Sequence, residues 1–176
     1  KDDLPPPPTN ITRLSELNIL GVTFTNKLKV TQHIKNLLSK LASGIYVIKL
    51  LKSRGLTEEA MHLVYNALVI SRITYACPAW WGFAVQEERK KLVCFVKRIK
   101  YGYCKHNYDL IKSIKKADNK LLLKIINNNS HVLHKLLPPV NPNLRGSRNR
   151  RHDRMVPTLD SINQKNYIAR VMHDIH

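Results

Sequence analysis

The sequence predicts a mainly α-helical protein: a helical bundle with a short N-terminal β strand or hairpin and a basic, partly disordered C-terminal tail. Apolar residues recur with helical period over Thr31–Lys52, and Thr57–Trp81 is apolar on almost every side in its second half. Alternation of apolar and polar residues, which is typical of a strand, is confined to Leu17–Val30. Helices therefore supply most of the expected core.

Composition predicts a single domain with a polyanionic partner. The chain has 176 residues, and 30 Lys plus Arg against 12 Asp plus Glu give a formal charge of +18. A field of that strength attracts polyanions, and nucleic acid is the obvious one. A membrane competes as a polyanion, but no signal peptide is visible and the apolar runs fall far short of the roughly 20 residues of a span. We therefore expect no membrane partner.

The cysteines bear on the redox compartment, and the first residue bears on how much of the polypeptide this sequence represents. Cys77, Cys94 and Cys104 are an odd number without a disulfide pattern, which favours a reducing compartment. The chain begins at Lys1 without a methionine, and we interpret it as a piece of a longer polypeptide. We expect four regions: a Pro-rich linker (1–16), a strand or hairpin (17–30), a helical bundle (31–139) and a basic tail (140–176).

The first two regions are short and extended. The proline run at 5–8 cannot donate backbone hydrogen bonds, so it is expected to be an extended linker. In the next region Ile19, Leu20, Val22 and Phe24 form the alternating pattern, and Thr25-Asn26-Lys27 supplies a turn. An isolated hairpin is only marginally stable, so we expect this one to belong to a larger sheet.

Thr31–Lys52 is the clearest amphipathic helix, with Thr31 expected as its cap and Gly55 as its end. No carboxylate occurs between Leu17 and Thr57, while lysines are frequent. A solvated helix face is the ordinary explanation of such a charge run. The absence of counter-charge favours a surface that faces a polyanion, with Lys35 and Lys40 as candidate phosphate contacts.

Thr57–Trp81 is expected to be one buried helix around which the bundle is organised. Thr57 is the predicted N-cap, and Glu58 and Glu59 stand in the first turn, at the positive end of the helix dipole. Pro78 is expected to stop this helix.

A third helix is predicted over Gln86–Tyr103, and its exposed face is expected to carry positive charges only. No acid occurs from Arg89 to Tyr108, and Lys90, Lys91, Lys97 and Arg98 are expected to point outward as phosphate contacts. Tyr101 and Tyr103 either stack on bases or sugars or close the core at the helix end, and the sequence leaves both open.

The remaining chain predicts short helices and then an arginine-rich segment. Helical pieces are expected at Tyr108–Ala117, Leu121–Ile126 and His131–Leu137, broken at Asp118-Asn119 and at 127–129. After Pro138-Pro139, the tail is expected to stay disordered until it meets a polyanion, and a last short helix is expected near Tyr167. The candidate phosphate contacts of the tail are Arg145, Arg148, Arg150, Arg151 and Arg154.

Catalytic chemistry is not predicted for this chain. A nucleotidyl transferase needs convergent carboxylates that hold divalent metal, whereas the paired acids here stand at helix starts, where capping explains them. A zinc site is not expected either, because Cys94 is expected on the core side of its helix and only the Cys104/His106 pair remains. The sequence therefore predicts no catalytic residue, no metal ligand and no cofactor.

Several stretches together resemble a known family. Leu20-Gly21-Val22 followed by Leu28 and Gln32-His33-Ile34, then SRITYACPAW at 71–80 and KLLLKIINNNSHVLHKLLPP at 120–139, are similar to the region after the catalytic palm in reverse transcriptases of non-LTR, LINE-type (Jockey-like) retrotransposons. The order and spacing of these stretches carry the resemblance, since no one of them is specific alone. It extends from Leu17 to the C-terminus.

The resemblance implies an end-of-palm strand near Ile19–Phe24 and a helical thumb from Thr31 that embraces a template–primer duplex. The Tyr/Phe-Ala-Asp-Asp turn of the family is absent, and so are the palm and fingers, which would hold magnesium and carry RNA-directed DNA synthesis in the parent protein. The implied partners are RNA or an RNA–DNA duplex and the missing palm and fingers; the implied location is intracellular, in cytoplasm and nucleus.

Three alternatives stay open beside this interpretation. The bundle could be an interaction module that docks the rest of its own polypeptide or a host factor. It could be a decayed transposon remnant without independent function. It could also be a basic RNA-binding protein of the ribosomal kind.

Overall fold

The computed structural model describes residues 5, 10–103, 108–140, 154–158 and 163–174, with the backbone alone for 100–103. It confirms the predicted fold class, a mainly helical chain with a two-stranded antiparallel hairpin near its N-terminus. In chain order the elements are β1 (Glu16–Ile19), β2 (Val22–Thr25), α1 (Thr31–Ser53), α2 (Glu58–Tyr65), the π-helical η1 (Asn66–Ile70), α3 (Ser71–Thr74), α4 (Cys77–Trp80), the 3₁₀ turn η2 (Trp81–Phe83), α5 (Gln86–Tyr103), α6 (Leu110–Ile126), the 3₁₀ turns η3 (His134–Leu136) and η5 (Asn163–Lys165), and α7 (Tyr167–Asp174).

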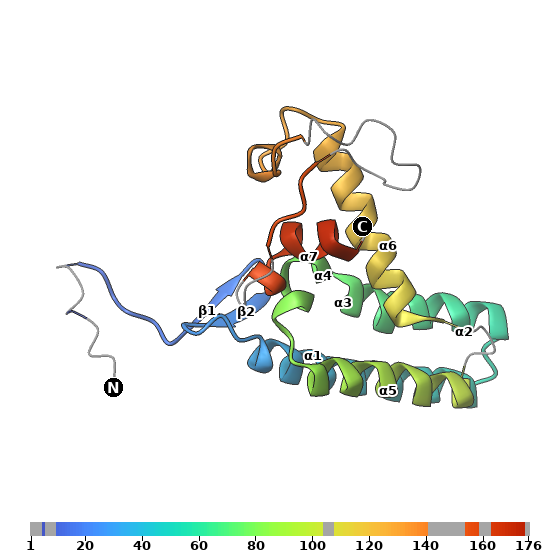
Figure 1. Cartoon of the computed structure of the whole chain (residues 1–176). Helices are drawn as coiled ribbons and strands as arrows, with labels where there is room; N and C mark the ends of the chain where they lie inside the picture. The colour runs from blue at the N-terminus through green and yellow to red at the C-terminus, as the bar shows by residue number, and fades with distance from the viewer. Residues whose placement is uncertain (1–4, 6–9, 104–107, 141–153, 159–162, 175–176) are drawn as a thin grey trace.

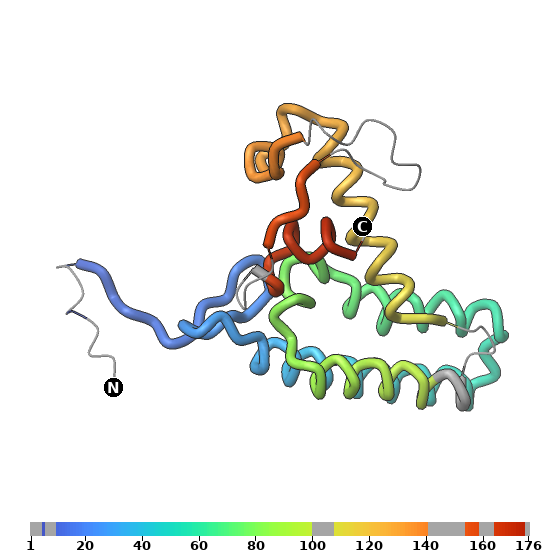
Figure 2. Tube along the Cα trace, viewed as in Figure 1, coloured from blue at the N-terminus to red at the C-terminus, as the bar shows by residue number. Residues whose placement is uncertain are grey.

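The chain runs out along α1, returns along α2, η1 and α3, and runs out again along α5 (Figure 2). Helices α1 and α5 lie side by side, and α6 rises from the far end of this layer (Figure 1). The hairpin lies at the opposite end, where α1 begins, and α7 packs against α6 (Figure 1).

The hairpin turns at Leu20-Gly21, not at the predicted Thr25-Asn26-Lys27. Both turn residues have positive φ, +48° and +86°, as a two-residue hairpin loop of the primed type requires. The hydroxyl of Tyr75 donates to the Leu20 carbonyl at 3.0 Å and ties this turn to the bundle. The predicted turn does exist, but it leads from β2 into α1.

Helix α1 has the predicted core face, with Ile34, Leu37, Leu41 and Ile48 buried. Its cap differs from the prediction: Val30 is the N-cap residue, and no side chain there makes a capping hydrogen bond. At the other end, Gly55 has φ +82° just after the helix, which agrees with the predicted stop.

The central stretch is shorter and less uniform than the single buried helix that was predicted. The Thr57 side chain accepts from the Ala60 backbone N–H, so the predicted N-cap is confirmed. The helix passes through a π-helical turn and ends at Thr74, before the proline. Ala76 then adopts φ +48°, and Pro78 lies in the first turn of the short helix α4 instead of ending the long one, because a missing N–H is tolerated in a first turn.

Burial along this stretch is also one-sided. In its second half, Val69, Ile70 and Ile73 are buried, whereas Tyr75 is mostly exposed, at 57%, and Ala67 is exposed as well. The prediction of an apolar surface covered on almost every side was therefore wrong; one face carries the core.

Helix α6 runs unbroken from Leu110 to Ile126, so the predicted break at Asp118-Asn119 was wrong. Asp118 is buried in mid-helix, and Arg170 of α7 donates to its carboxylate at 2.7 Å. The predicted third piece near His134 is only a 3₁₀ turn, η3. A partner from a distant part of the chain thus allows an aspartate where local propensity predicts a stop.

Two hydrophobic clusters form the core. The larger joins β2 to α1–α5 and the first turns of α6, and includes both Trp80 and Trp81. The smaller joins the second half of α6 to α7, with Leu122, Ile125 and Met172 at its centre. The predicted last helix is confirmed as α7, whose apolar residues are buried in this second cluster.

Candidate nucleic-acid interface

Four of the predicted phosphate contacts lie together on the exposed face of α5. Lys90 and Lys91 precede Cys94 by one helical turn, and Lys97 and Arg98 follow it by one turn, so the four charges surround this exposed thiol. We call these four residues the α5 cation cluster. The expectation that Cys94 faces the core was wrong: Leu92, Val96 and Ile99 fill the core side of α5 instead.

No acid of the described chain forms an ion pair with the α5 cation cluster, although Glu87 stands one helical turn before Lys90 and Lys91. Glu88 is buried and accepts from the Val85 N–H at 3.0 Å, a capping contact of the kind predicted for the paired acids. Glu87 is exposed in the first turn but makes no ion pair with a described residue. The four cations are therefore not neutralised within the described part of the chain.

Lys35 and Lys40 are both exposed on α1 but do not share a face. Five residues along a helix correspond to a rotation of roughly 140°. On the flank of Lys40, Arg72 of α3 donates to the Lys40 carbonyl at 2.9 Å, which places Lys40 beside α3. The structure therefore does not bring the two predicted α1 contacts together.

The predicted tail contacts Arg145, Arg148, Arg150 and Arg151 lie outside the described residues. Arg154 is described and half-buried: its guanidinium donates to the Pro138 carbonyl at 2.8 Å. Arg154 also forms an isolated antiparallel bridge with Val140, and the Met155 N–H donates to the Pro139 carbonyl at 2.9 Å. Val140 and Arg154, which are 14 residues apart in sequence, thus lie next to each other.

Sequence reasoning missed a second set of cations, on α6. Lys112, Lys116, Lys120 and Lys124 recur at every fourth position and are all exposed. We call them the α6 lysine row. The i, i+4 spacing was visible in the sequence, but the break predicted at Asp118-Asn119 divided the row between two helices.

An arginine of α5 contacts the backbone of the turn between α3 and α5 instead of pointing into solvent. Here Arg89 donates through Nε to the Trp81 carbonyl at 3.2 Å and through Nη2 to the Gly82 carbonyl at 3.1 Å. Its guanidinium carbon lies 5.5 Å from the centroid of the Trp81 ring. Burial, together with the nearby charge of Arg170, lowers the pKa of Arg89.

Helix α7 closes this corner. Gly82 packs so tightly against the Lys165 carbonyl oxygen that a Cβ there would overlap it. The Tyr167 hydroxyl donates to the Asp118 carbonyl at 2.7 Å, beside the Arg170–Asp118 ion pair. Burial raises the pKa of the neighbouring Cys77 thiol from 9.0 to about 12, and raises the pKa of Tyr167 as well. We call Trp80, Trp81, Gly82, Arg89, Asp118 and Arg170 the corner.

Metal ligands do not gather in the described residues, where no three His, Cys, Asp or Glu side chains lie close enough to hold an ion. His62 contacts Asn66 across one helical turn at 2.9 Å, and His131 accepts from the Leu133 N–H at 3.1 Å. Cys104 and His106 lie outside the described residues.

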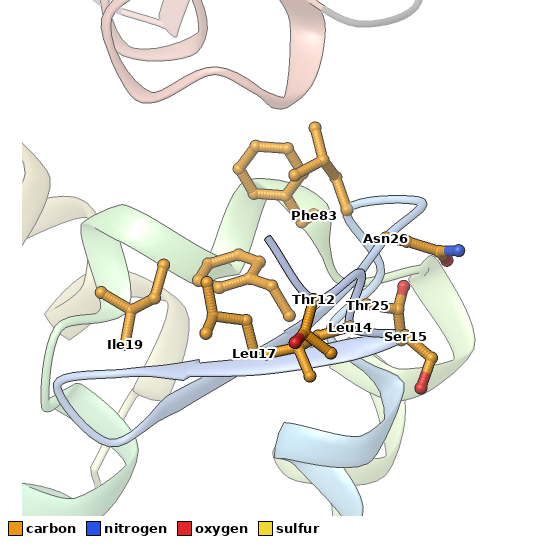
Figure 3. A pocket seen from close by; sticks show the side chains of 10 residues that line it. Thr12, Leu14, Ser15, Leu17, Ile19, Thr25, Asn26 and Phe83 are labelled. Atoms are coloured by element: carbon orange, nitrogen blue, oxygen red, sulfur yellow. The ribbon is translucent and has the colours of Figure 1, made fainter. Parts of the chain in front are cut away.

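The hairpin carries an apolar groove of about 570 Å³ (Figure 3). Leu17 and Ile19 of β1, with Leu14 and Leu28, supply apolar side chains that stay about half exposed. Phe83 of η2 closes one side and meets Phe24 edge-on, with ring centroids 5.9 Å apart.

Comparisons of the chain with family models, with curated proteins and with solved structures found no match. Among the described helices, none combines the length and the apolar character needed to cross a membrane.

Proposed function

We propose that this chain is the thumb-like, nucleic-acid-binding part of a LINE-type reverse transcriptase, and that it contributes binding without catalysis. The observation that carries the proposal is the α5 cation cluster: four exposed cations around Cys94, none of them paired with a described acid. The assignment to the LINE-type family is based on the resemblance of the sequence alone.

The chemistry of the α5 cation cluster favours phosphates over bases. Lysine is a flexible point charge, which suits phosphate oxygens, and three of the four side chains are lysines. Helix α5 is a rigid support, because its opposite face is buried against α1 and the core. A rigid cationic face binds a phosphate backbone with little sequence preference.

The test is the salt dependence of duplex binding. We expect the full chain to bind a labelled RNA–DNA duplex of mixed sequence, and fluorescence anisotropy measures this binding. The salt concentration is varied from about 50 to about 200 mM, because binding to several phosphates weakens strongly over this range. Lys90→Gln/Lys91→Gln/Lys97→Gln/Arg98→Gln should lower the magnitude of the log–log salt slope by about 0.9 for each phosphate that the variant no longer neutralises on B-form duplex. Binding that does not respond to salt contradicts the proposal.

Cys94 offers an internal reporter for the same experiment. It is exposed at the centre of the α5 cation cluster, whereas Cys77 is buried. Bound duplex should slow alkylation of Cys94 by N-ethylmaleimide, and Cys77 should stay unreactive with or without duplex. Equal Cys94 alkylation rates with and without saturating duplex would place the nucleic acid elsewhere.

An interaction module is the second candidate function, and the apolar groove of the hairpin favours it. Leu14, Leu17, Ile19 and Leu28 each leave about half of the side chain exposed at this groove, and a contiguous apolar surface of this kind is typical of a contact site. Failure of the duplex titration, with retention of a folded chain, would favour this function over the first.

A further inference from the structure

We propose that the α6 lysine row is a second phosphate-binding surface, which holds one strand of nucleic acid along the length of α6. This inference rests on the proposed function and extends it from the α5 cation cluster to a separate helix.

The geometry of the α6 lysine row is that of a line. Each step of four residues advances about 6 Å along the helix and rotates about 40°, so the four ammonium groups follow a gently turning track about 18 Å long. The α5 cation cluster differs, because its four residues surround a centre at Cys94. A line of single charges suits one phosphodiester strand that runs parallel to the helix axis.

The charge of the α6 lysine row is not compensated. The acids at this helix are Asp109, whose side chain accepts from the Lys112 N–H as the N-cap, and Asp118, which is buried and paired with Arg170. None of the four ammonium groups pairs with a described carboxylate. Like charges at i, i+4 oppose helix formation, so a row of them needs support from packing.

Packing supplies that support from the opposite side of α6. Ile114, Asp118, Leu122 and Ile125 are buried against the bundle and α7, so α6 is held as a helix whatever the repulsion on its exposed face. Solubility alone would be served equally well by mixed lysines and glutamates, which attract each other at this spacing. A row of positive charges alone, on a helix whose opposite face is packed against the core, is the arrangement expected of a phosphate-binding surface.

The test compares two variants with the same change in charge. In the row variant, Lys112, Lys116, Lys120 and Lys124 are replaced by Gln. In the control variant, four exposed lysines scattered over the chain, Lys27, Lys49, Lys115 and Lys135, are replaced by Gln. Lys115 is the sharpest of these controls, because it lies on α6 beside the row and is rotated by roughly 100° from Lys116.

Salt slopes are measured with a single-stranded RNA and with an RNA–DNA duplex. We expect the row variant to lower the slope on single-stranded RNA by about 2.8, which is four phosphates at about 0.7 each, and the control variant to lower it by less than about 1. Equal slopes for the two variants would overturn the inference, because charge alone would then explain binding. Circular dichroism of both variants should match the parent chain.

Two further arms separate failure of the inference from failure of the proposed function. If the α5 variant loses binding and the row variant does not, the inference is wrong and the proposed function stands; if the parent chain binds neither RNA nor duplex, both are wrong. Acetylation of lysines, read by mass spectrometry, should show RNA protecting the row more than Lys115. Protection by phosphatidylserine vesicles but not by RNA would assign the row to a lipid surface and overturn the inference.

Discussion

The corner and the exposed faces of α5 and α6 use positive charge in opposite ways. At the corner, Arg89 and Arg170 donate to backbone carbonyls and to the buried carboxylate of Asp118, so their charges serve the structure. On α5 and α6, lysines dominate, and they have no described acidic partner. Arginine offers several fixed donors for buried geometry, whereas lysine keeps its ammonium hydrated at the surface.

This contrast teaches where stability and binding lie in the chain. Loss of one partner of the Asp118–Arg170 pair should strongly destabilise the fold, because the remaining charge is left buried. Removal of an exposed lysine should leave the fold intact and weaken binding to a polyanion. The following predictions test that division.

The largest effect is expected for Asp118→Leu. The change leaves the Arg170 guanidinium buried beside α6 without its acid, and breaking a buried pair costs about 3–5 kcal/mol. Urea unfolding of the full chain measures the loss. The double variant Asp118→Leu/Arg170→Met should recover much of it, since no buried charge remains; a double variant as unstable as the single one would contradict the assigned role of the pair.

A smaller loss is expected for Gly82→Ala. Its Cβ would overlap the Lys165 carbonyl oxygen, so η5 and α7 must shift, and overpacking of this kind costs about 1–3 kcal/mol. The matched control is Gly44→Ala in α1, where the new Cβ would meet Leu68 Cβ at an ordinary 3.5 Å. The control should be neutral or stabilising, since alanine favours a helix interior over glycine. Equal thermal midpoints for the two variants would show that η5 does not pack on Gly82.

Alkaline pH should destabilise the fold through Cys77, which lies near Asp118 and Arg170 of the corner. The Cys77 thiol has a pKa of about 12 in the folded chain against 9.0 as the reference value, so the unfolded state loses its proton first. Stability is therefore fully present below pH 9.0 and falls as the pH rises toward about 12, by on the order of 1 kcal/mol at pH 10. The raised pKa of Tyr167 adds to the loss at higher pH. Cys77→Ala should flatten the decline of the urea midpoint between pH 8 and pH 10, about one unit on either side of the reference value; an unchanged decline would show that the thiol is not its source.

The smallest effect on stability is expected for Lys90→Gln/Lys97→Gln. Both side chains are exposed and unpaired within the described chain, and surface changes of this kind shift the free energy of unfolding by less than about 0.5 kcal/mol. Urea unfolding should therefore match the parent chain while duplex affinity falls. A clear loss of stability would mean that the α5 cation cluster has a structural role like that of the corner.

Prediction from sequence succeeded where local pattern decides the outcome. The period of Ile34, Leu37 and Leu41 predicted the core face of α1, and the Thr57 cap needs only the Ala60 backbone three residues away. It failed where a distant residue decides. The α6 break was predicted at Asp118 because nothing nearby in sequence reveals Arg170, 52 residues further along.

The candidate site divides in the same way. Lys90, Lys91, Lys97 and Arg98 could be grouped from helical spacing alone, since one helix carries all four. Lys35 and Lys40 were joined to them by charge, although five residues along one helix already separate the two lysines by a rotation of roughly 140°. The α6 lysine row was missed because its helix was not predicted as one piece.

The sequence by itself determined the helical class, the core face of α1 and the excess of positive charge, because these follow from periodicity and composition. Only the tertiary structure decided that α6 is continuous, that Pro78 lies in the first turn of a helix, and that Arg89 and Arg170 belong to the corner while the lysines stay exposed. For α6 the physical reason is that the buried charge of Asp118 needs a partner, and that partner, Arg170 of α7, is far away in sequence and adjacent only after folding.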